Sequence, residues 1–236
     1  MLEDGSIDIE VAIGKVKSDD MHFPRTKLLC LENTYNGKPL SPKYMQCATA
    51  AARKVNLRSH LDGARLMNAA IANKCTPREL ASSFDTVSLC LSKGLGAPVG
   101  SVLVGNQDFI NEARRVRKML GGGMRQAGIL AACGIVAMKN QVDRLIQDHA
   151  LAARLASELA QIPDIEPEPQ GANTNMVFIK VEHKHRAPLQ SFLKEEGILI
   201  GGRPPTFRLV LHRDVTENDV NKTVSSIAKF FRELSY

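Results

Sequence analysis

Hydrophobic and polar positions along this chain alternate between short apolar runs and longer amphipathic stretches, a rhythm typical of α/β units. Apolar runs at residues 27–32, 57–61 and 84–91 predict buried strands, and the run at 99–104 predicts further extended structure. The amphipathic stretches between and after these runs predict helices. Those helices are expected over residues 42–55, 66–71, 76–79, 108–120 and from 124 through about 148.

Local capping signals mark where two of these helices begin. Ser41 followed by Pro42 supplies an N-cap and a proline at the first helical position. Thr76 and Glu79 have the spacing of a capping box. Further along, the glycines of residues 121–123 interrupt the helical pattern.

The last part of the chain has a different pattern. Residues 163–171 are rich in Pro, Glu and polar side chains, and they predict a loop. The elements expected after it are strands at 175–181 and 207–211 and helices at 189–196 and 216–234. We therefore expect two domains, a larger α/β domain over residues 1–141 and a smaller α+β domain over 142–236, with the boundary inside the long helix near Gln141.

Composition limits the class of protein. The chain has 236 residues, of which 44% are hydrophobic and 24% charged, as in ordinary globular proteins. No run of about twenty apolar residues is present, which argues against a transmembrane helix. The first residues are acidic where a signal or transit peptide is basic, so we expect a cytoplasmic location. Scattered cysteines without paired spacing predict reduced thiols and no metal site: Cys30, Cys47, Cys75, Cys90 and Cys133.

The charge balance is moderately basic. A formal net charge of +6 comes from 31 Lys and Arg against 25 Asp and Glu. The densest basic cluster is residues 114–118, with Arg125 soon after it. Nucleic-acid sites usually add stacking aromatics or a recognisable module, and neither lies nearby. We expect no nucleic-acid or membrane partner, while a local phosphate site stays open.

Two residues at predicted strand ends carry the most informative chemistry. Asp62 and Lys93 each lie at or just beyond the C-terminal end of a strand, where ligands collect in open α/β sheets. A carboxylate and an amine that converge there suit pyridoxal phosphate, because the lysine forms an imine with the aldehyde and the aspartate keeps the ring nitrogen protonated. Read alone, however, Asp-Gly and Lys-Gly pairs often mark simple turns. The pattern by itself leaves both interpretations open.

Longer motifs resemble those of low-specificity L-threonine aldolases, which are pyridoxal-phosphate enzymes of the aspartate-aminotransferase fold (fold type I). The likeness covers essentially the whole chain in order. The segments that carry it are Leu31-Glu-Asn-Thr-Tyr-Asn36, His60-Leu-Asp-Gly-Ala-Arg65, Ser88-Leu-Cys-Leu-Ser-Lys-Gly-Leu-Gly-Ala-Pro-Val-Gly-Ser101, Gly121-Gly-Gly-Met-Arg-Gln126 and Phe207-Arg-Leu-Val-Leu-His212. The resemblance implies an α/β fold with a partial fold type I large domain and a smaller C-terminal α+β domain.

The resemblance assigns roles to four residues. Lys93 resembles the lysine that forms the Schiff base, and Asp62 resembles the partner of the pyridine nitrogen. Arg65 resembles the arginine that reaches the cofactor's 3′-oxygen and the substrate carboxylate, and an exposed helix arginine is the alternative. Arg208 resembles the second arginine, which grips the α-carboxylate from the small domain, with Arg203 as a nearby rival. Either of the last two could instead be a salt-bridged surface residue.

Three further residues receive roles from the same resemblance. Arg125, at a predicted helix start after the glycines, is expected to approach the cofactor phosphate of a neighbouring subunit, with Lys118 as a weaker companion. His22 is similar to a family histidine near the active site and could help move the proton of the substrate hydroxyl. A loop histidine with a structural hydrogen bond is the alternative for His22.

The implied reaction is retro-aldol cleavage of L-threonine or L-allo-threonine to glycine and an aldehyde by a homo-oligomer. Family members begin well upstream of Met1, in a portion that holds the Gly-Thr phosphate cup, a ring-stacking histidine and a substrate-binding serine. Where the family has its usual histidine, this chain has Tyr35. We therefore expect a truncated chain with poor cofactor retention and open sheet edges or apolar surface. The alternatives are an inactive partner of intact subunits and another β-eliminating lyase of fold type I.

Overall fold

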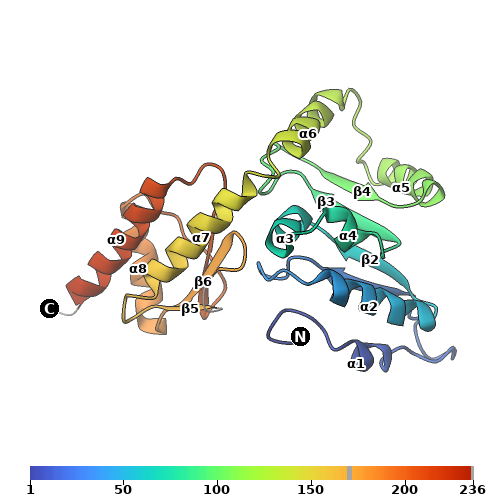
Figure 1. Cartoon of the computed structure of the whole chain (residues 1–236), viewed down its shortest axis with the longest axis horizontal. Coiled ribbons are helices and arrows are strands. Elements are labelled where there is room, and N and C mark those ends of the chain that lie inside the picture. The colour runs from blue at the N-terminus through green and yellow to red at the C-terminus, as the bar shows by residue number, and fades with distance from the viewer. Residues whose placement is uncertain (169–171, 235–236) are drawn as a thin grey trace. The chain divides into compact units, whose positions relative to one another are not determined.

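The structure is a computed structural model that describes residues 1–168 and 172–234 (Figure 1). The chain divides into two compact units, Met1–Asp143 and Arg144–Tyr236, and each is described by itself. The domain boundary expected near Gln141 lies close to this division. Among the described residues, no helix is both long and apolar enough to cross a membrane.

A four-stranded sheet forms the centre of the first unit. Its strands, in order, are β1 (Leu28–Glu32), β2 (Arg58–Asp62), β3 (Thr86–Cys90) and β4 (Ser101–Val104). The first three strands are parallel, and β4 is antiparallel to β3. Helical connections return the chain to the same end of the sheet, so the carboxyl ends of β1, β2 and β3 lie side by side. The buried strands predicted from the apolar runs are confirmed.

Helices follow the parallel strands at the positions that the capping signals predict. The helices described in this unit are α1 (Ile9–Ile13), α2 (Pro42–Lys54), α3 (Leu66–Asn73), α4 (Pro77–Ala81), α5 (Gln107–Met119) and α6 (Gly128–Asn140). Ser41 caps α2 by accepting a hydrogen bond from the Tyr44 amide at 3.2 Å. The Glu79 amide donates to the Thr76 hydroxyl at 3.2 Å, and the Thr76 amide donates to the Glu79 carboxylate at 2.7 Å, so the capping box is confirmed.

The two faces of this sheet differ in burial. Alternate strand residues form a buried apolar face, made of Leu29, Leu31, Leu61, Val87 and Leu89. α2 packs against β1 and β2, and α3 and α4 lie on the same side of the sheet as α2 (Figure 1). The residues between them, including Cys30, Glu32 and Asp62, point to the other face and are exposed.

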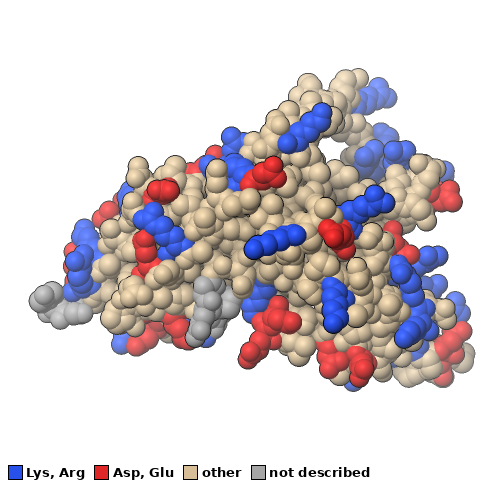
Figure 2. All heavy atoms as spheres, in the orientation of Figure 1, with Lys and Arg blue, Asp and Glu red and all other residues tan. Residues whose placement is uncertain are grey.

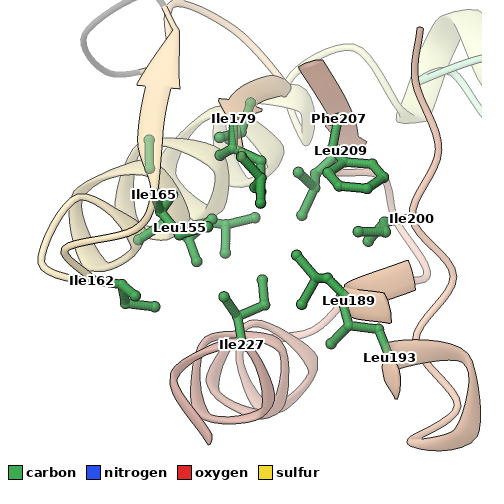
Figure 3. Close-up of a cluster of buried hydrophobic side chains, with 14 of the residues drawn as sticks. Leu155, Ile162, Ile165, Ile179, Leu189, Leu193, Ile200, Phe207, Leu209 and Ile227 are labelled. Atoms are coloured by element: carbon green, nitrogen blue, oxygen red, sulfur yellow. The ribbon is translucent and has the colours of Figure 1, made fainter. Parts of the chain in front are cut away.

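The second unit has an antiparallel sheet covered by helices. Its strands are β5 (Glu166–Glu168), β6 (Met176–Lys180) and β7 (Thr206–Val210), in that order. Its described helices are α7 (Leu145–Leu159), α8 (His183–Glu195) and α9 (Glu217–Leu234). Side chains from the sheet and from all three helices point into one core, among them Leu155, Ile179, Leu189, Phe207 and Ile227 (Figure 3).

Two expectations for helices are wrong. The single helix expected from 124 to about 148 is two helices, α6 and α7, because the chain leaves the helical conformation at residues 141–144. The apolar pattern continues across this break, so periodicity does not locate it. The helix expected to begin at Leu189 begins at His183 and holds Pro188 in its interior. Proline is far more common at helix starts than in helix interiors, which explains this error.

The loop expected over residues 163–171 contains the short strand β5, whose Glu166 pairs with Lys180 of β6. Residues 169–171 of that loop lie outside the described part of the chain. On the visible face of the molecule, basic and acidic side chains are interspersed, and basic ones gather over α5 (Figure 2). α5 itself carries the exposed residues Arg114, Arg115 and Arg117.

Candidate active site

The carboxyl ends of the three parallel strands bring polar side chains together. Glu32 ends β1 and Asp62 ends β2, and these two residues are partners in the parallel register. Asp62 is in turn the partner of Ser88 on β3. Side chains at paired positions of neighbouring parallel strands project from the same face. The two carboxyl groups therefore lie next to each other at the end of the sheet.

The turn after β2 fixes Asp62 and directs the chain toward Arg65. The Asp62 carboxylate accepts a hydrogen bond from the Ala64 amide at 3.0 Å. Gly63 donates its amide to the Ser88 carbonyl at 2.8 Å, and a Cβ at position 63 would lie 2.8 Å from that same carbonyl oxygen. Only glycine therefore lets the chain pass so close to β3. Arg65 follows as the half-buried N-cap residue of α3.

Lys93 lies in the turn that follows β3. Its carbonyl accepts a hydrogen bond from the Gly96 amide at 2.8 Å, and Gly96 has a φ of 71°, which favours glycine. The Lys93 side chain is exposed. The lysine is thus held at the backbone and free to reach a ligand at the strand ends.

Charges at this site act on one another through Glu32. Partial burial and the negative charge of Asp62 raise the pKa of the Glu32 carboxyl overall, and the positive charges of Arg65 and Lys93 only partly oppose this rise. All three residues are therefore close enough to the Glu32 carboxyl to affect its ionisation. The structure thus places Asp62, Arg65 and Lys93 at neighbouring strand ends, while their chemical roles stay predictions.

Sequence reasoning missed Glu32 as a member of this site. The sequence did contain an indication of this role, because Glu32 ends a predicted strand just as Asp62 ends the next one. A single glutamate at a strand end is more often a solvated residue. Only the register between β1 and β2 shows that Glu32 lies beside Asp62.

The chemistry of these side chains fits pyridoxal phosphate. An exposed amine can bind its aldehyde, a neighbouring carboxylate can pair with a protonated ring nitrogen, and a guanidinium can donate to the ring oxygen. Lys93, Asp62 and Arg65 supply these groups at the end of a parallel sheet, where ligands of open α/β folds bind. The described residues contain no cluster of three or more His, Cys, Asp or Glu side chains that could hold a metal ion.

The predicted phosphate residues lie around the glycine turn between α5 and α6. Lys118 folds over this turn, since a Cβ at Gly123 would lie 2.4 Å from the Lys118 Cδ. Arg125 is exposed in the turn and does not begin a helix as expected, because α6 begins at Gly128 after the N-cap Ala127. Its guanidinium is consequently available to a ligand, but not as part of a helix N-terminus.

His22 lies in an exposed loop, and its side chain is 80% exposed. The Asp20 carboxylate accepts hydrogen bonds from the His22 amide at 2.8 Å and lies 2.7 Å from its Nδ1. These hydrogen bonds from the backbone and side chain of His22 lower the pKa of Asp20. With Nδ1–H donated to Asp20, Nε2 remains free to accept a proton.

The second unit contains a cavity of about 480 Å³, and only one of the two arginines considered for the substrate carboxylate lines it. Arg208, on β7, lines it together with His212 and Lys222, whereas Arg203 is not among the lining residues. The Arg208 amide donates to the Gly201 carbonyl at 2.6 Å, which fixes the backbone beneath the guanidinium. Gly202 has a φ of 143°, and a Cβ there would lie 2.6 Å from the Thr206 carbonyl oxygen.

Comparison with known proteins places these features in a family. The sequence profile of the family described as beta-eliminating lyase matches residues 2–182. The low specificity L-threonine aldolase of Escherichia coli K12 is 47% identical over 218 residues, which cover 92% of this chain and 64% of that protein. A probable low-specificity L-threonine aldolase of Arabidopsis thaliana is 38% identical over 97% of this chain and 67% of its own length.

Solved structures agree on the fold. A threonine aldolase of Leishmania major superposes with a TM-score of 0.78 at 21% identity, over 97% of this chain and 68% of that one. At this identity the likeness establishes the fold alone. The chain thus spans 64–68% of the length of these three proteins.

Proposed function

The chain belongs to the beta-eliminating lyase family and is related within it to the low-specificity L-threonine aldolases, and from this premise we propose that it carries the pyridoxal-phosphate site of an aldehyde-lyase. The proposed reaction cleaves the Cα–Cβ bond of L-threonine, L-allo-threonine and other β-hydroxy-α-amino acids to glycine and an aldehyde. The observation that carries this proposal is the shared carboxyl edge of β2 and β3, where Asp62 ends β2, Arg65 caps the next helix and Lys93 lies in the turn after β3. When bound, the cofactor supplies an electron sink for the pair left on Cα.

Each residue at the strand ends has a distinct task. Lys93 holds the aldehyde carbon of the cofactor through its amine. The Asp62 carboxylate keeps the ring nitrogen protonated, and the Ala64 amide orients that carboxylate. Arg65 donates to the oxygen on the ring and to the substrate carboxylate.

Basic side chains and one histidine complete the proposed machinery. Arg125 and Lys118 bind the phosphate by charge and hydrogen bonding. His22 accepts the proton of the substrate hydroxyl at Nε2, while Asp20 holds its Nδ1–H. Arg208 binds the α-carboxylate of the substrate, a role that its position on the cavity wall supports over Arg203.

The cysteines and the exposed apolar side chains support a cellular location and an oligomeric assembly. We place the protein in the cytoplasm because its five cysteines are free thiols. A homo-oligomer fits the exposed apolar side chains on and after α5, which include Met119, Leu120 and Met124.

The test is selective modification of Lys93. The purified chain would be incubated with pyridoxal phosphate, reduced with borohydride and mapped by peptide mass spectrometry. Selective labelling of Lys93 is expected, because reduction traps the cofactor on the amine even where binding is weak. K93A should lose the label, and the matched control K43A, which removes an exposed lysine on α2, should keep it. Labelling spread evenly over surface lysines would contradict the proposal.

A product assay separates the proposed reaction from a second one, β-elimination, which the family description favours. Threonine cleavage releases acetaldehyde and glycine, whereas β-elimination releases ammonia and a 2-oxo acid, which is pyruvate from an aromatic amino acid such as tyrosine and 2-oxobutanoate from threonine. Acetaldehyde formed by the wild-type chain but not by K93A would support the aldehyde-lyase. Pyruvate with ammonia would favour the second candidate.

A further inference from the structure

Two cations line the cavity of the second unit without an ion-pair partner of their own. They are Arg208 on β7 and Lys222 on α9, and both are exposed. In the part of the chain that the structure describes, no carboxylate forms an ion pair with either of them. Lys229, on the same helix as Lys222, does have such a partner, since its Nζ lies 3.4 Å from Glu196 Oε1. The two cations of the cavity are therefore available to an anionic ligand.

The acidic side of the cavity is already engaged. Among the described lining residues, Asp219 is the one carboxylate. It accepts hydrogen bonds from the Thr216 amide at 2.8 Å and from the Thr216 hydroxyl at 2.7 Å, at the start of α9. Arg208 and Lys222 outnumber it, so the cavity carries a surplus of positive charge. A concave surface with one dominant sign of charge attracts ligands of the opposite sign.

The two cations meet the segment 197–201 at its opposite ends. A Cβ at Gly197 would lie 3.8 Å from the Lys222 Nζ, whereas the Arg208 amide donates to the Gly201 carbonyl at 2.6 Å. Four residues of chain span at most about 14 Å. The Lys222 ammonium and the backbone of Arg208 thus lie near the two ends of a short stretch that one small linear ligand can bridge.

The rest of the cavity wall is largely apolar and is built on the closed core of this unit. Leu155, Ile200 and Leu209 line the cavity and belong to the core drawn in Figure 3. The volume of about 480 Å³ is within the range of small-molecule sites. A ligand with an anionic group at each end and methylene groups between them matches this wall.

We infer that this cavity binds a linear dicarboxylate, with one carboxylate on Arg208 and the other on Lys222. The guanidinium and the ammonium form charge-assisted hydrogen bonds to the two carboxylates, and the methylene chain packs on the apolar wall. The binding itself does not depend on the proposed function. Its consequence does rest on that function, because a dicarboxylate on Arg208 competes there with the carboxylate of the substrate.

Calorimetric titration of the full purified chain with glutarate, without cofactor, tests the site. Saturable binding is expected. Pentanoate has the same carbon chain and only one carboxylate, so it should bind at least about tenfold more weakly. Absence of saturable glutarate binding would overturn the inference, and so would equal affinities for glutarate and pentanoate.

Variants then test the two cations separately. K222Q should weaken glutarate binding about tenfold and leave pentanoate binding unchanged, because only the second carboxylate loses its partner. The matched control K229Q removes a lysine of the same helix that does not line the cavity, and it should bind glutarate as wild type does. R208Q should weaken the binding of both acids, with circular dichroism as the check that it folds. Equal glutarate affinity in K222Q and K229Q would contradict the assignment.

This inference and the proposed function fail in different ways. Glutarate binding that depends on Lys222, in a chain whose Lys93 is not selectively labelled by pyridoxal phosphate, would overturn the proposed function and leave the dicarboxylate site standing. Selective labelling of Lys93 without glutarate binding would overturn the dicarboxylate site alone.

Discussion

In the second unit, apolar side chains from three helices and the sheet meet in one buried cluster, whereas in the first unit many stay at the surface. The first unit exposes all four residues of β4 and buries none of α5. Apolar residues of both elements line a shallow cavity, among them Leu103, Phe109, Val116 and Leu120. Both units have a buried core, but the first leaves more large apolar side chains exposed than the second, where Ile146, Leu199 and Leu234 are exposed.

The open surface of the first unit can be compared with the share of the related proteins that this chain spans. The chain spans 64% of the first relative's length, and its proposed catalytic side chains lie in the unit with the open surface. Exposed apolar area next to a site is typical of a surface that another segment or subunit covers. The contrast predicts that equivalent substitutions cost more stability in the closed core of the second unit than on the open surface of the first, and the following variants test it.

The largest contrast is expected between two phenylalanines. Phe207, in the core of the second unit, is 2% exposed, and its ring centroid lies 4.1 Å from the Arg186 Cζ. Phe109 on α5 is 41% exposed. F207A should lower the free energy of unfolding of its unit by about 3–5 kcal/mol, because it leaves a cavity in a closed core. F109A should cost less than about 1 kcal/mol. Urea unfolding followed by circular dichroism measures both, and equal losses would refute the contrast.

Two adjacent glycines give a sharper pair within the second unit. A Cβ at Gly202 would lie 2.6–2.9 Å from backbone atoms of residues 206–208, and its φ of 143° disfavours other residues. No atom lies within 4 Å of a Cβ built at Gly201. G202A should destabilise by about 1–3 kcal/mol and displace Arg208, and G201A should be nearly neutral. Urea unfolding curves of the two variants measure the loss in unfolding free energy. Similar losses in both would contradict the argument that close backbone contacts at Gly202 require glycine.

Sequence reasoning anticipated the buried strands and the placement of Asp62 and Lys93 at strand ends, because buried strands have distinctive apolar runs. It could not reveal Glu32, whose place depends on the register of β1 against β2. Nor could spacing alone rank Arg208 above Arg203, since the ranking depends on a cavity wall built by distant residues. The start of α8 was placed too late because a proline inside a helix, such as Pro188, is uncommon.

In the first unit, a smaller and pH-dependent effect is expected at Asp85. Burial alone would raise the pKa of this carboxyl, but hydrogen bonds from the Ser59 amide at 2.8 Å and hydroxyl at 2.9 Å, together with Arg58, lower it overall. The stabilisation is therefore present above the unfolded pKa of about 3.9 and is lost as pH falls through the lower folded value. D85N should destabilise by about 1–2 kcal/mol at neutral pH.

The pH dependence provides the check on Asp85. The difference in unfolding free energy between wild type and D85N should shrink as the pH falls below about 4. D143N, which alters an exposed aspartate, should show no comparable trend. A difference that stays constant with pH would mean that the carboxylate charge is not what links β2 to the segment before β3.

Substitutions of two equally exposed leucines should have the smallest effect on stability. They also test the open surface of the first unit most directly. Leu120 follows α5 and is 82% exposed, and Leu199 in the second unit is 83% exposed. Neither L120K nor L199K should change the unfolding free energy by more than about 0.5 kcal/mol, since neither side chain is buried in the chain. If the surface around α5 is an interface between copies, L120K should weaken self-association about tenfold, the scale of one leucine returned to water. Light scattering over a range of protein concentrations measures this, and equal association of L120K and L199K would show that the open surface of the first unit does not mediate contact between copies.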